Sequence, residues 1–131
     1  MYCLDSNIII ELFKGNQDIK EHISDLQDSN KEIFINPIIL SELYKGVYTT
    51  NKKEIILKFL EDFLREIIFL DFDKESCKLF GELYSNLVKK GKITQETDLM
   101  IATICIRNNI TLITQNKKHF ENISELNVEF W

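Results

Sequence analysis

MYCLDSNIIIELFKG, residues 1–15, places a strand, an acid and a helix in direct succession. The apolar run at residues 2–4 predicts a short buried strand that ends at Asp5. A short helix is predicted from there to Phe13, and Gly15 ends it. A strand joined directly to a helix is the first unit of an alternating α/β chain.

The same alternation continues along the rest of the chain. Apolar runs predict further strands at residues 33–35, 67–70 and 111–113, and a weak fifth at 128–130. Amphipathic spacing predicts helices at residues 19–26, 37–47, 52–66 and 73–88, and the almost wholly apolar stretch 99–106 predicts a helix buried on more than one side. We therefore expect one α/β domain, residues 1–131, with three layers: a mostly parallel central sheet of four to five strands flanked by helices.

Polar residues mark the predicted helix starts. Ser6 or Asn7 can cap the first helix, because their side chains accept a hydrogen bond from a free backbone N–H. Asn36 has the same capability and precedes Pro37, a residue favoured at the first helical position. Asp73 begins the long helix that follows the third strand.

Composition sets limits on the function. The chain has 131 residues, of which 44% are apolar and 28% charged, which is ordinary for a globular domain. Its net charge of −5 excludes a protein that coats nucleic acid by bulk electrostatics. Contact with RNA or DNA would need a local basic patch or bridging metal ions.

The cysteine pattern and the hydropathy suggest a compartment. Cys3, Cys77 and Cys105 are odd in number and far apart, which fits neither a disulfide framework nor zinc spacing. Each lies in an apolar stretch, so we predict three buried, reduced thiols and a reducing cytoplasm. No apolar run approaches the roughly 18–20 residues that span a membrane, and no signal peptide is evident. We expect a cytoplasmic protein without membrane association.

Four oxygen-bearing side chains are predicted to meet at the carboxyl edge of the sheet: Asp5, Glu42, Asp98 and Asn116. Asp5 and Asn116 follow strands, and Asp98 opens the apolar helix. Glu42 lies in the second turn of its helix and can reach back to the edge. Clustered carboxylates raise each other's pKa unless a cation joins them, and Mg²⁺ prefers such oxygen ligands. A cation held there could activate water for phosphodiester hydrolysis.

Each of these side chains also has a purely structural interpretation. Those interpretations are Asp5 as a helix cap, Asp98 as a partner of its helix dipole, Glu42 as an ion pair with Lys45, and Asn116 as a turn residue. Gly46 lies one turn from Glu42 on the same helix face, and a helical glycine there suggests close approach by another group.

Four segments together resemble the signature blocks of PIN domains. They are LDSN at residues 4–7, SELYKG at 41–46, DLMIA at 98–102 and TQNKKHF at 114–120. Their order and spacing resemble most closely the VapC-type toxin ribonucleases of toxin–antitoxin pairs. The resemblance implies a Mg²⁺- or Mn²⁺-dependent endoribonuclease that acts on RNA, forms a homodimer and is blocked by a cognate antitoxin.

The resemblance also implies roles for individual residues. Asp5, Glu42 and Asp98 match the family's acidic metal-site residues. Asn116 stands where the family often has Asp, and we expect it to hold a metal-bound water. Ser6 replaces the commoner Thr and keeps the hydroxyl.

Substrate contacts are predicted beside these positions. Ser6 and Asn7 follow the first acid directly, and Lys117 and Lys118 adjoin Asn116, where they can reach RNA phosphate. A solvated lysine face is the structural alternative for the two lysines. The two histidines, at positions 22 and 119, are predicted to be surface or loop residues.

Two competing functions stay open. A haloacid-dehalogenase-like phosphatase also has an Asp after its first strand, but it needs a second Asp two residues later, where this chain has Asn7. The other is a catalytically weak PIN-like module that binds RNA or protein, which loss of the acids would favour.

Overall fold

The computed structural model describes residues 1–92 and 94–131. The central sheet has five strands: β1 (Tyr2–Leu4), β2 (Ile33–Ile35), β3 (Ile68–Phe69), β4 (Thr111–Thr114) and β5 (Val128–Phe130). Their spatial order is β3-β2-β1-β4-β5, and every pairing is parallel. The predicted α/β class and the weak fifth strand are thus confirmed, and β1 lies at the centre of the sheet.

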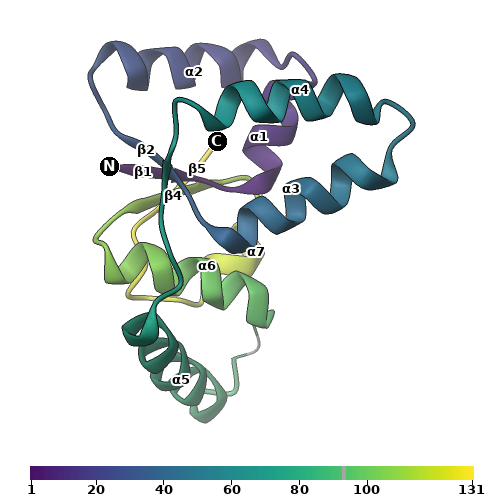
Figure 1. Ribbon diagram of the computed structural model, residues 1–131. Coiled ribbons are helices and arrows are strands. Elements are labelled where there is room, and N and C mark those ends of the chain that lie inside the picture. Colours follow the sequence, from purple (N-terminus) through teal and green to yellow (C-terminus); the bar gives the residue numbers. More distant parts are fainter. Residues whose placement is uncertain (93) are drawn as a thin grey trace.

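Helices cover the sheet on both sides. They are α1 (Ser6–Phe13), α2 (Gln17–Asp28), α3 (Pro37–Thr49), α4 (Lys53–Leu64), α5 (Lys74–Lys89), α6 (Glu96–Arg107) and α7 (Lys117–Phe120). In Figure 1, α2 and α4 lie above the sheet, whereas α5 and α6 lie below it. This is the three-layer arrangement that the sequence predicts. None of the helices in the described residues is long and apolar enough to cross a membrane.

Helix caps fix where the elements begin. Asn36 is fully buried, and its side chain accepts hydrogen bonds from the backbone N–H groups of Ile38 and Ile39. The prediction of Ser6 or Asn7 as the cap of α1 is wrong. Asp5 is the cap, because β1 ends at Leu4 and α1 begins directly at Ser6, so Asp5 is the only residue between the two elements.

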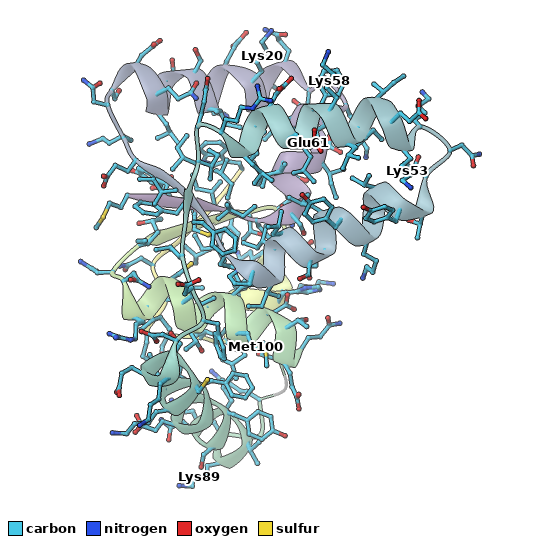
Figure 2. All side chains as sticks on the ribbon, viewed as in Figure 1. Lys20, Lys53, Lys58, Glu61, Lys89 and Met100 are labelled. Carbon is cyan, nitrogen blue, oxygen red and sulfur yellow. The ribbon has the colours of Figure 1, made fainter. Side chains whose placement is uncertain are left out.

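The core includes buried side chains from the strands and from helices α1 to α6. The side chains of α6 are buried almost all round, including Leu99, Ile101, Ala102 and Ile104, each with no exposed surface. This confirms the prediction from the apolar stretch. By contrast, charged side chains such as Lys20, Lys58 and Glu61 lie on the outer surface of α2 and α4 (Figure 2). The position of α6 is therefore set by burial rather than by surface contacts.

The three thiols have different surroundings. Cys3 and Cys105 are buried as predicted. A hydrogen bond with the Cys105 thiol, together with burial, raises the pKa of the Cys3 thiol well above its usual value. The prediction of a buried Cys77 is wrong: this thiol is exposed, because it lies on the solvent face of α5.

Candidate active site

One open pocket collects the four side chains that the sequence singles out. Asp5 comes from the end of β1, Glu42 from α3, Asp98 from α6, and Asn116 from the turn after β4. Strands β1 and β4 are neighbours, with Leu4 opposite Ile113, so their carboxyl ends deliver side chains to the same place. The pocket has a volume of about 460 Å³.

Asp5 is held from three directions. Its side chain is only 3% exposed, and its Oδ1 accepts a hydrogen bond of 2.7 Å from the backbone N–H of Ser6. Its Oδ2 accepts hydrogen bonds from the Asn7 amide, at 3.0 Å, and from the hydroxyl of Thr114. The cap interpretation and the site interpretation are therefore compatible, because one carboxylate oxygen caps α1 while the same side chain lines the pocket.

Glu42 is oriented by a neighbouring hydroxyl. Ser6 Oγ donates a hydrogen bond of 2.7 Å to Glu42 Oε2, which ties the start of α1 to α3. In the part of the chain that the structure describes, no ion pair joins Glu42 to Lys45. Lys45 is exposed and lines the same pocket, where it is a cation beside the carboxylates.

The expectation of a close approach at Gly46 is wrong. A methyl group added there would meet no atom within 4 Å, so no neighbour requires the glycine. Gly46 instead lines two adjoining pockets, the carboxylate pocket and a second, apolar one. The missing side chain therefore leaves space between the two pockets.

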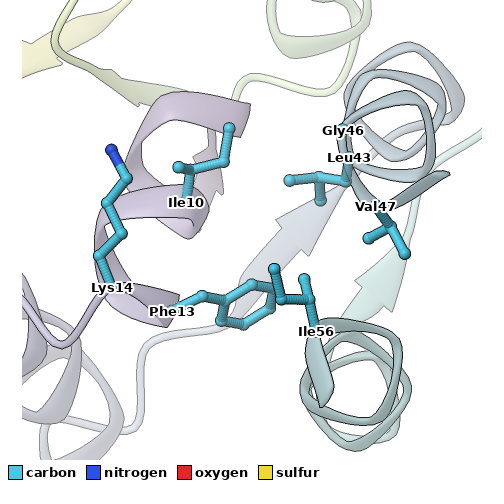
Figure 3. Close-up of a pocket in the computed structure, with 7 residues that line it drawn as sticks. All are labelled: Ile10, Phe13, Lys14, Leu43, Gly46, Val47 and Ile56. Carbon is cyan, nitrogen blue, oxygen red and sulfur yellow. The ribbon is translucent and has the colours of Figure 1, made fainter. Parts of the chain in front are cut away.

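The second pocket, which we call the apolar groove, is lined by Ile10, Phe13, Lys14, Leu43, Gly46, Val47 and Ile56. Figure 3 shows that these residues come from α1, α3 and α4, and that Phe13 and Ile56 point toward each other. Ile10 lines both pockets and is 39% exposed. The apolar groove thus continues directly into the carboxylate pocket.

Asp98 is a buried acid whose surroundings disfavour its negative charge. It stands in the first turn of α6, as the dipole interpretation requires, and is 8% exposed. Burial raises the pKa of this carboxyl, and the negative charges of Asp5 and Glu42 raise it further, while His119 opposes the shift. His119 Nδ1 lies 3.1 Å from Asp98 Oδ2, although the contact does not have hydrogen-bond geometry.

Asn116 directly precedes α7, in the position of its N-cap. Its side chain makes no cap hydrogen bond and faces the carboxylate pocket, while its backbone N–H donates to Thr114 Oγ1 at 3.1 Å. Ser6 also lines the pocket. Asn7, Lys117 and Lys118 lie outside the lining that the described residues form. The Asn7 amide is engaged with Asp5 and Thr114, and both lysines are exposed on α7.

Besides Lys45, Thr114 and His119 are residues of this site that the predictions from sequence do not include. Thr114 is fully buried and contacts Asp5, and His119 contacts Asp98. Thr114 is the last residue of β4, which pairs with β1. Its place beside Asp5 can be predicted only when the order of the strands in the sheet is known. His119 carries no such signal, because a histidine on a short helix is ordinarily a surface residue.

The donor set fits a hard divalent cation. Within residues 1–92 and 94–131, no three histidine, cysteine or carboxylate side chains are close enough to form a ready-made metal cage. Mg²⁺ is usually bound by one or two carboxylates and keeps several waters, so it does not need such a cage. Asp5, Glu42 and Asp98 line one pocket, and burial together with the charges of Asp5 and Glu42 raises the pKa of Asp98, which is the excess of negative charge that a cation would neutralise.

Comparisons with known proteins agree on one family. The PIN domain model matches residues 2–126. Ribonuclease VapC2 of Rickettsia felis is 36% identical over 131 residues, covering 100% of this chain and 98% of that protein. Ribonuclease VapC1 of Haemophilus influenzae strain R2866 is 31% identical over 132 residues, covering 100% and 98%. The structure of VapBC2 from Rickettsia felis bound to a DNA fragment from their promoter superposes with a TM-score of 0.91 at 35% identity, covering 99% of this chain and 98% of that chain.

Proposed function

Because the chain belongs to the PIN domain family, we propose that it is the ribonuclease toxin of a toxin–antitoxin pair and cleaves RNA phosphodiester bonds in the carboxylate pocket. The observation that carries this proposal is the meeting of Asp5, Glu42 and Asp98 with Asn116 at one open site. Lys45 is one cationic side chain against three carboxylates in this pocket, and such an excess of acids serves a cation or a reaction better than it serves the fold.

Mg²⁺ or Mn²⁺ is the proposed cofactor, held by Asp5, Glu42 and Asp98, with Asn116 contributing a neutral oxygen. When bound, such a cation activates water and stabilises the charge that develops during phosphodiester hydrolysis. An oxygen-only set selects these ions over zinc, which favours nitrogen and sulfur ligands. The cation also provides the positive charge that an acidic protein needs in order to meet a polyanion.

The other polar residues keep the carboxylates in place. The Ser6 hydroxyl holds Glu42, while Asn7 and Thr114 hold Asp5. A carboxylate with one oxygen fixed has fewer orientations to lose when it binds a cation. Ser6 also lines the pocket, where it can contact the substrate. Asn7 acts on the substrate only through Asp5, because its amide is already engaged.

Lysines around the pocket are the proposed phosphate contacts. Lys45 lines the pocket itself, and Lys117 and Lys118 lie on α7 next to Asn116. All three side chains are exposed, so each can move to follow an RNA backbone. Phosphate contacts position RNA without reading its sequence.

A phosphatase of the haloacid-dehalogenase type fits this site poorly. Its chemistry needs an acid two residues after Asp5, and the amide of the Asn7 there is not acidic enough to protonate a leaving group. A cleavage assay tests the alternative of a non-catalytic module. If the chain only bound RNA, the RNA would stay uncut both with and without a divalent cation.

The proposed partner is an antitoxin that covers the apolar groove. The groove offers Phe13, Val47 and Ile56 to an apolar segment and opens at Gly46 into the carboxylate pocket (Figure 3). A basic side chain on that segment could extend into the pocket and pair with the carboxylates. Such a partner would block RNA and the cation together.

A homodimer is proposed from the family resemblance. Tyr84 and Val88 on α5 are 44% and 58% exposed, which leaves an apolar strip on a helix whose inner face packs on α6. Light scattering on the purified chain, with Val88→Glu beside the wild type, measures this directly. A monomeric wild type would contradict the homodimer.

The decisive experiment combines cleavage with growth. The purified chain is expected to cut RNA with Mg²⁺ or Mn²⁺ and to stop when EDTA removes the cation. Expression is expected to arrest bacterial growth, and a co-expressed antitoxin is expected to relieve the arrest. Glu42→Gln, purified by the same protocol, controls for contaminating nucleases. If wild type and Glu42→Gln cut RNA and slow growth equally, the proposed chemistry is wrong.

A further inference from the structure

The last helix brings a histidine to the carboxylate pocket. Helix α7 has only four residues, and Phe120, 1% exposed, anchors it in the core. The His119 backbone N–H donates to the carbonyl of Asn116 at 3.1 Å, so both residues move as one turn. The anchored turn leaves the His119 side chain 41% exposed and points its Nδ1 at Asp98.

The three carboxylates of the pocket differ in how they are held. Asp5 accepts hydrogen bonds from three groups, and Glu42 accepts one from Ser6. Asp98 has His119 beside its carboxylate, with Nδ1 3.1 Å from Oδ2. That oxygen is buried and has no formed hydrogen bond. A buried carboxylate oxygen without a donor is costly, so the imidazole is the group placed to supply one.

We propose that His119 is the positioning residue of Asp98, with its Nδ1 fixing Oδ2 so that the carboxylate presents one orientation to the cation. This inference rests on the proposed function, since it concerns the same cation. Carboxylates that bind metals are ordinarily held by hydrogen bonds from a second layer of residues. For Asp5 and Glu42 this layer is visible as Ser6, Asn7 and Thr114, and His119 completes it for Asp98.

The geometry separates this role from direct ligation. Nδ1 faces the carboxylate, and the surrounding donors are oxygens, which suit a cation that rarely takes imidazole. His119 is therefore assigned to hold a ligand rather than to be one. The chain's other histidine, His22, packs against Trp131 with the ring planes tilted and the ring centres 4.9 Å apart, and it provides a matched control.

The test is Mn²⁺ binding measured by isothermal titration on the full chain at pH 8. His119→Ala is expected to weaken Mn²⁺ binding roughly 10–100-fold. His119→Asn is expected to restore most of the affinity, because its amide nitrogen replaces Nδ1. His119→Gln places its nitrogen where Nε2 lies and is expected to remain weak, and His22→Ala is expected to bind as the wild type does.

The possible results separate the role of His119 from the existence of the cation site. Wild-type affinity or tighter binding in His119→Ala overturns the role of His119 and leaves the cation site standing. Rescue by His119→Gln but not by His119→Asn overturns it as well. If the wild type binds no Mn²⁺, the cation site of the proposed function fails, and the role of His119 falls with it. Circular dichroism of each variant monitors the fold, and the Asn–Gln contrast decides even if His119→Ala unfolds.

Discussion

Asp5 and Asp73 perform the same local task in two regions of the molecule. Each ends a segment of extended backbone and caps the next helix, with its Oδ1 accepting a backbone N–H at 2.7 Å and 2.8 Å respectively. Asp73, at the start of α5, is exposed. Its hydrogen bonds from Ser76, helped by Arg107, lower the pKa of this carboxyl to about 2.

The same cap at α1 lies in the opposite environment. Asp5 is buried at the carboxyl edge of the central strand, and two further carboxylates, Glu42 and Asp98, line its pocket. The surroundings of Asp73 stabilise its negative charge, whereas those of the pocket acids crowd negative charge together. A capping aspartate therefore becomes part of the carboxylate pocket through its position in the sheet and not through its local sequence.

The largest expected effect separates the two caps by activity. Asp5→Asn is expected to lower RNA cleavage roughly a thousandfold or more, because a neutral amide cannot balance the charge of the cation. Asp73→Asn is expected to cut RNA at the wild-type rate. Asn caps helices about as well as Asp, so both variants should stay folded. Initial cleavage rates in Mn²⁺ measure the contrast, and equal rates for both variants would remove Asp5 from the site.

A smaller effect is expected at the neutral member of the pocket. Asn116→Ala is expected to lower cleavage roughly 10–100-fold, because orienting a metal-bound water is its proposed task. Asn116→Asp is expected to tighten Mn²⁺ binding, since a fourth carboxylate adds negative charge. Cleavage rates and calorimetric titration measure the two effects. Full activity in Asn116→Gly, with unchanged affinity in Asn116→Asp, would identify Asn116 as a turn residue only.

Replacement of the acid by Asn is expected to change Tm in opposite directions in the two regions, and both changes are expected to depend on pH. Asp98 has a raised pKa in the folded state, so its charge costs stability at neutral pH, and Asp98→Asn is expected to raise Tm by roughly a few degrees in EDTA. That gain should vanish as the pH falls through the folded pKa. Asp73 has a lowered pKa, so Asp73→Asn should lower Tm at pH 7, and this loss should shrink as the pH falls from about 4 towards 2.

Thermal unfolding in EDTA across pH 2–7 follows both variants. The sign of each Tm difference is the readout, and the double variant tests whether the two add, as distant sites should. A drop in Tm for Asp98→Asn at neutral pH would contradict the crowding of charge in the pocket.

The smallest expected effect concerns the glycine between the two pockets. Gly46→Ala is expected to stabilise the chain by about 0.5–1 kcal/mol, because the added methyl group has room and alanine favours the helix. Gly15→Ala is the matched control and is expected to destabilise, since Gly15 has a φ of +82°. Urea unfolding measures both. Destabilisation by Gly46→Ala would restore the idea of a close approach there.

Local signals were sufficient for most of the fold. The apolar runs locate the five strands, and Asn36 with Pro37 marks the start of α3 to the residue. Errors arise where a local pattern has two solutions. Ser6 and Asn7 have the chemistry of a cap, but α1 already begins at Ser6, so Asp5 is the cap. Cys77 lies in an apolar stretch yet on the outer face of its helix.

The candidate site was predictable only in part, for a physical reason. Its acids each stand at a strand end or near a helix start, which sequence alone can show. Thr114 and His119 matter through what they touch, namely Asp5 and Asp98, and those contacts depend on the packing of β4 and α7. Contacts of this kind, in which one side chain holds another in place, follow no periodicity and no fixed spacing in the sequence. They become visible only in the three-dimensional structure.

The hydrogen bond between Thr114 and Asp5 has a consequence for timing during protein synthesis. It joins residues 109 positions apart, and β4 must lie beside β1 for it to form. Contacts so distant along the chain form late, after the loop between them has closed. A nascent chain that ends near residue 100 therefore contains Asp5, Glu42 and Asp98 but lacks the strand that carries Thr114. The carboxylate pocket can take its folded form only after residues 111–114 have left the ribosome.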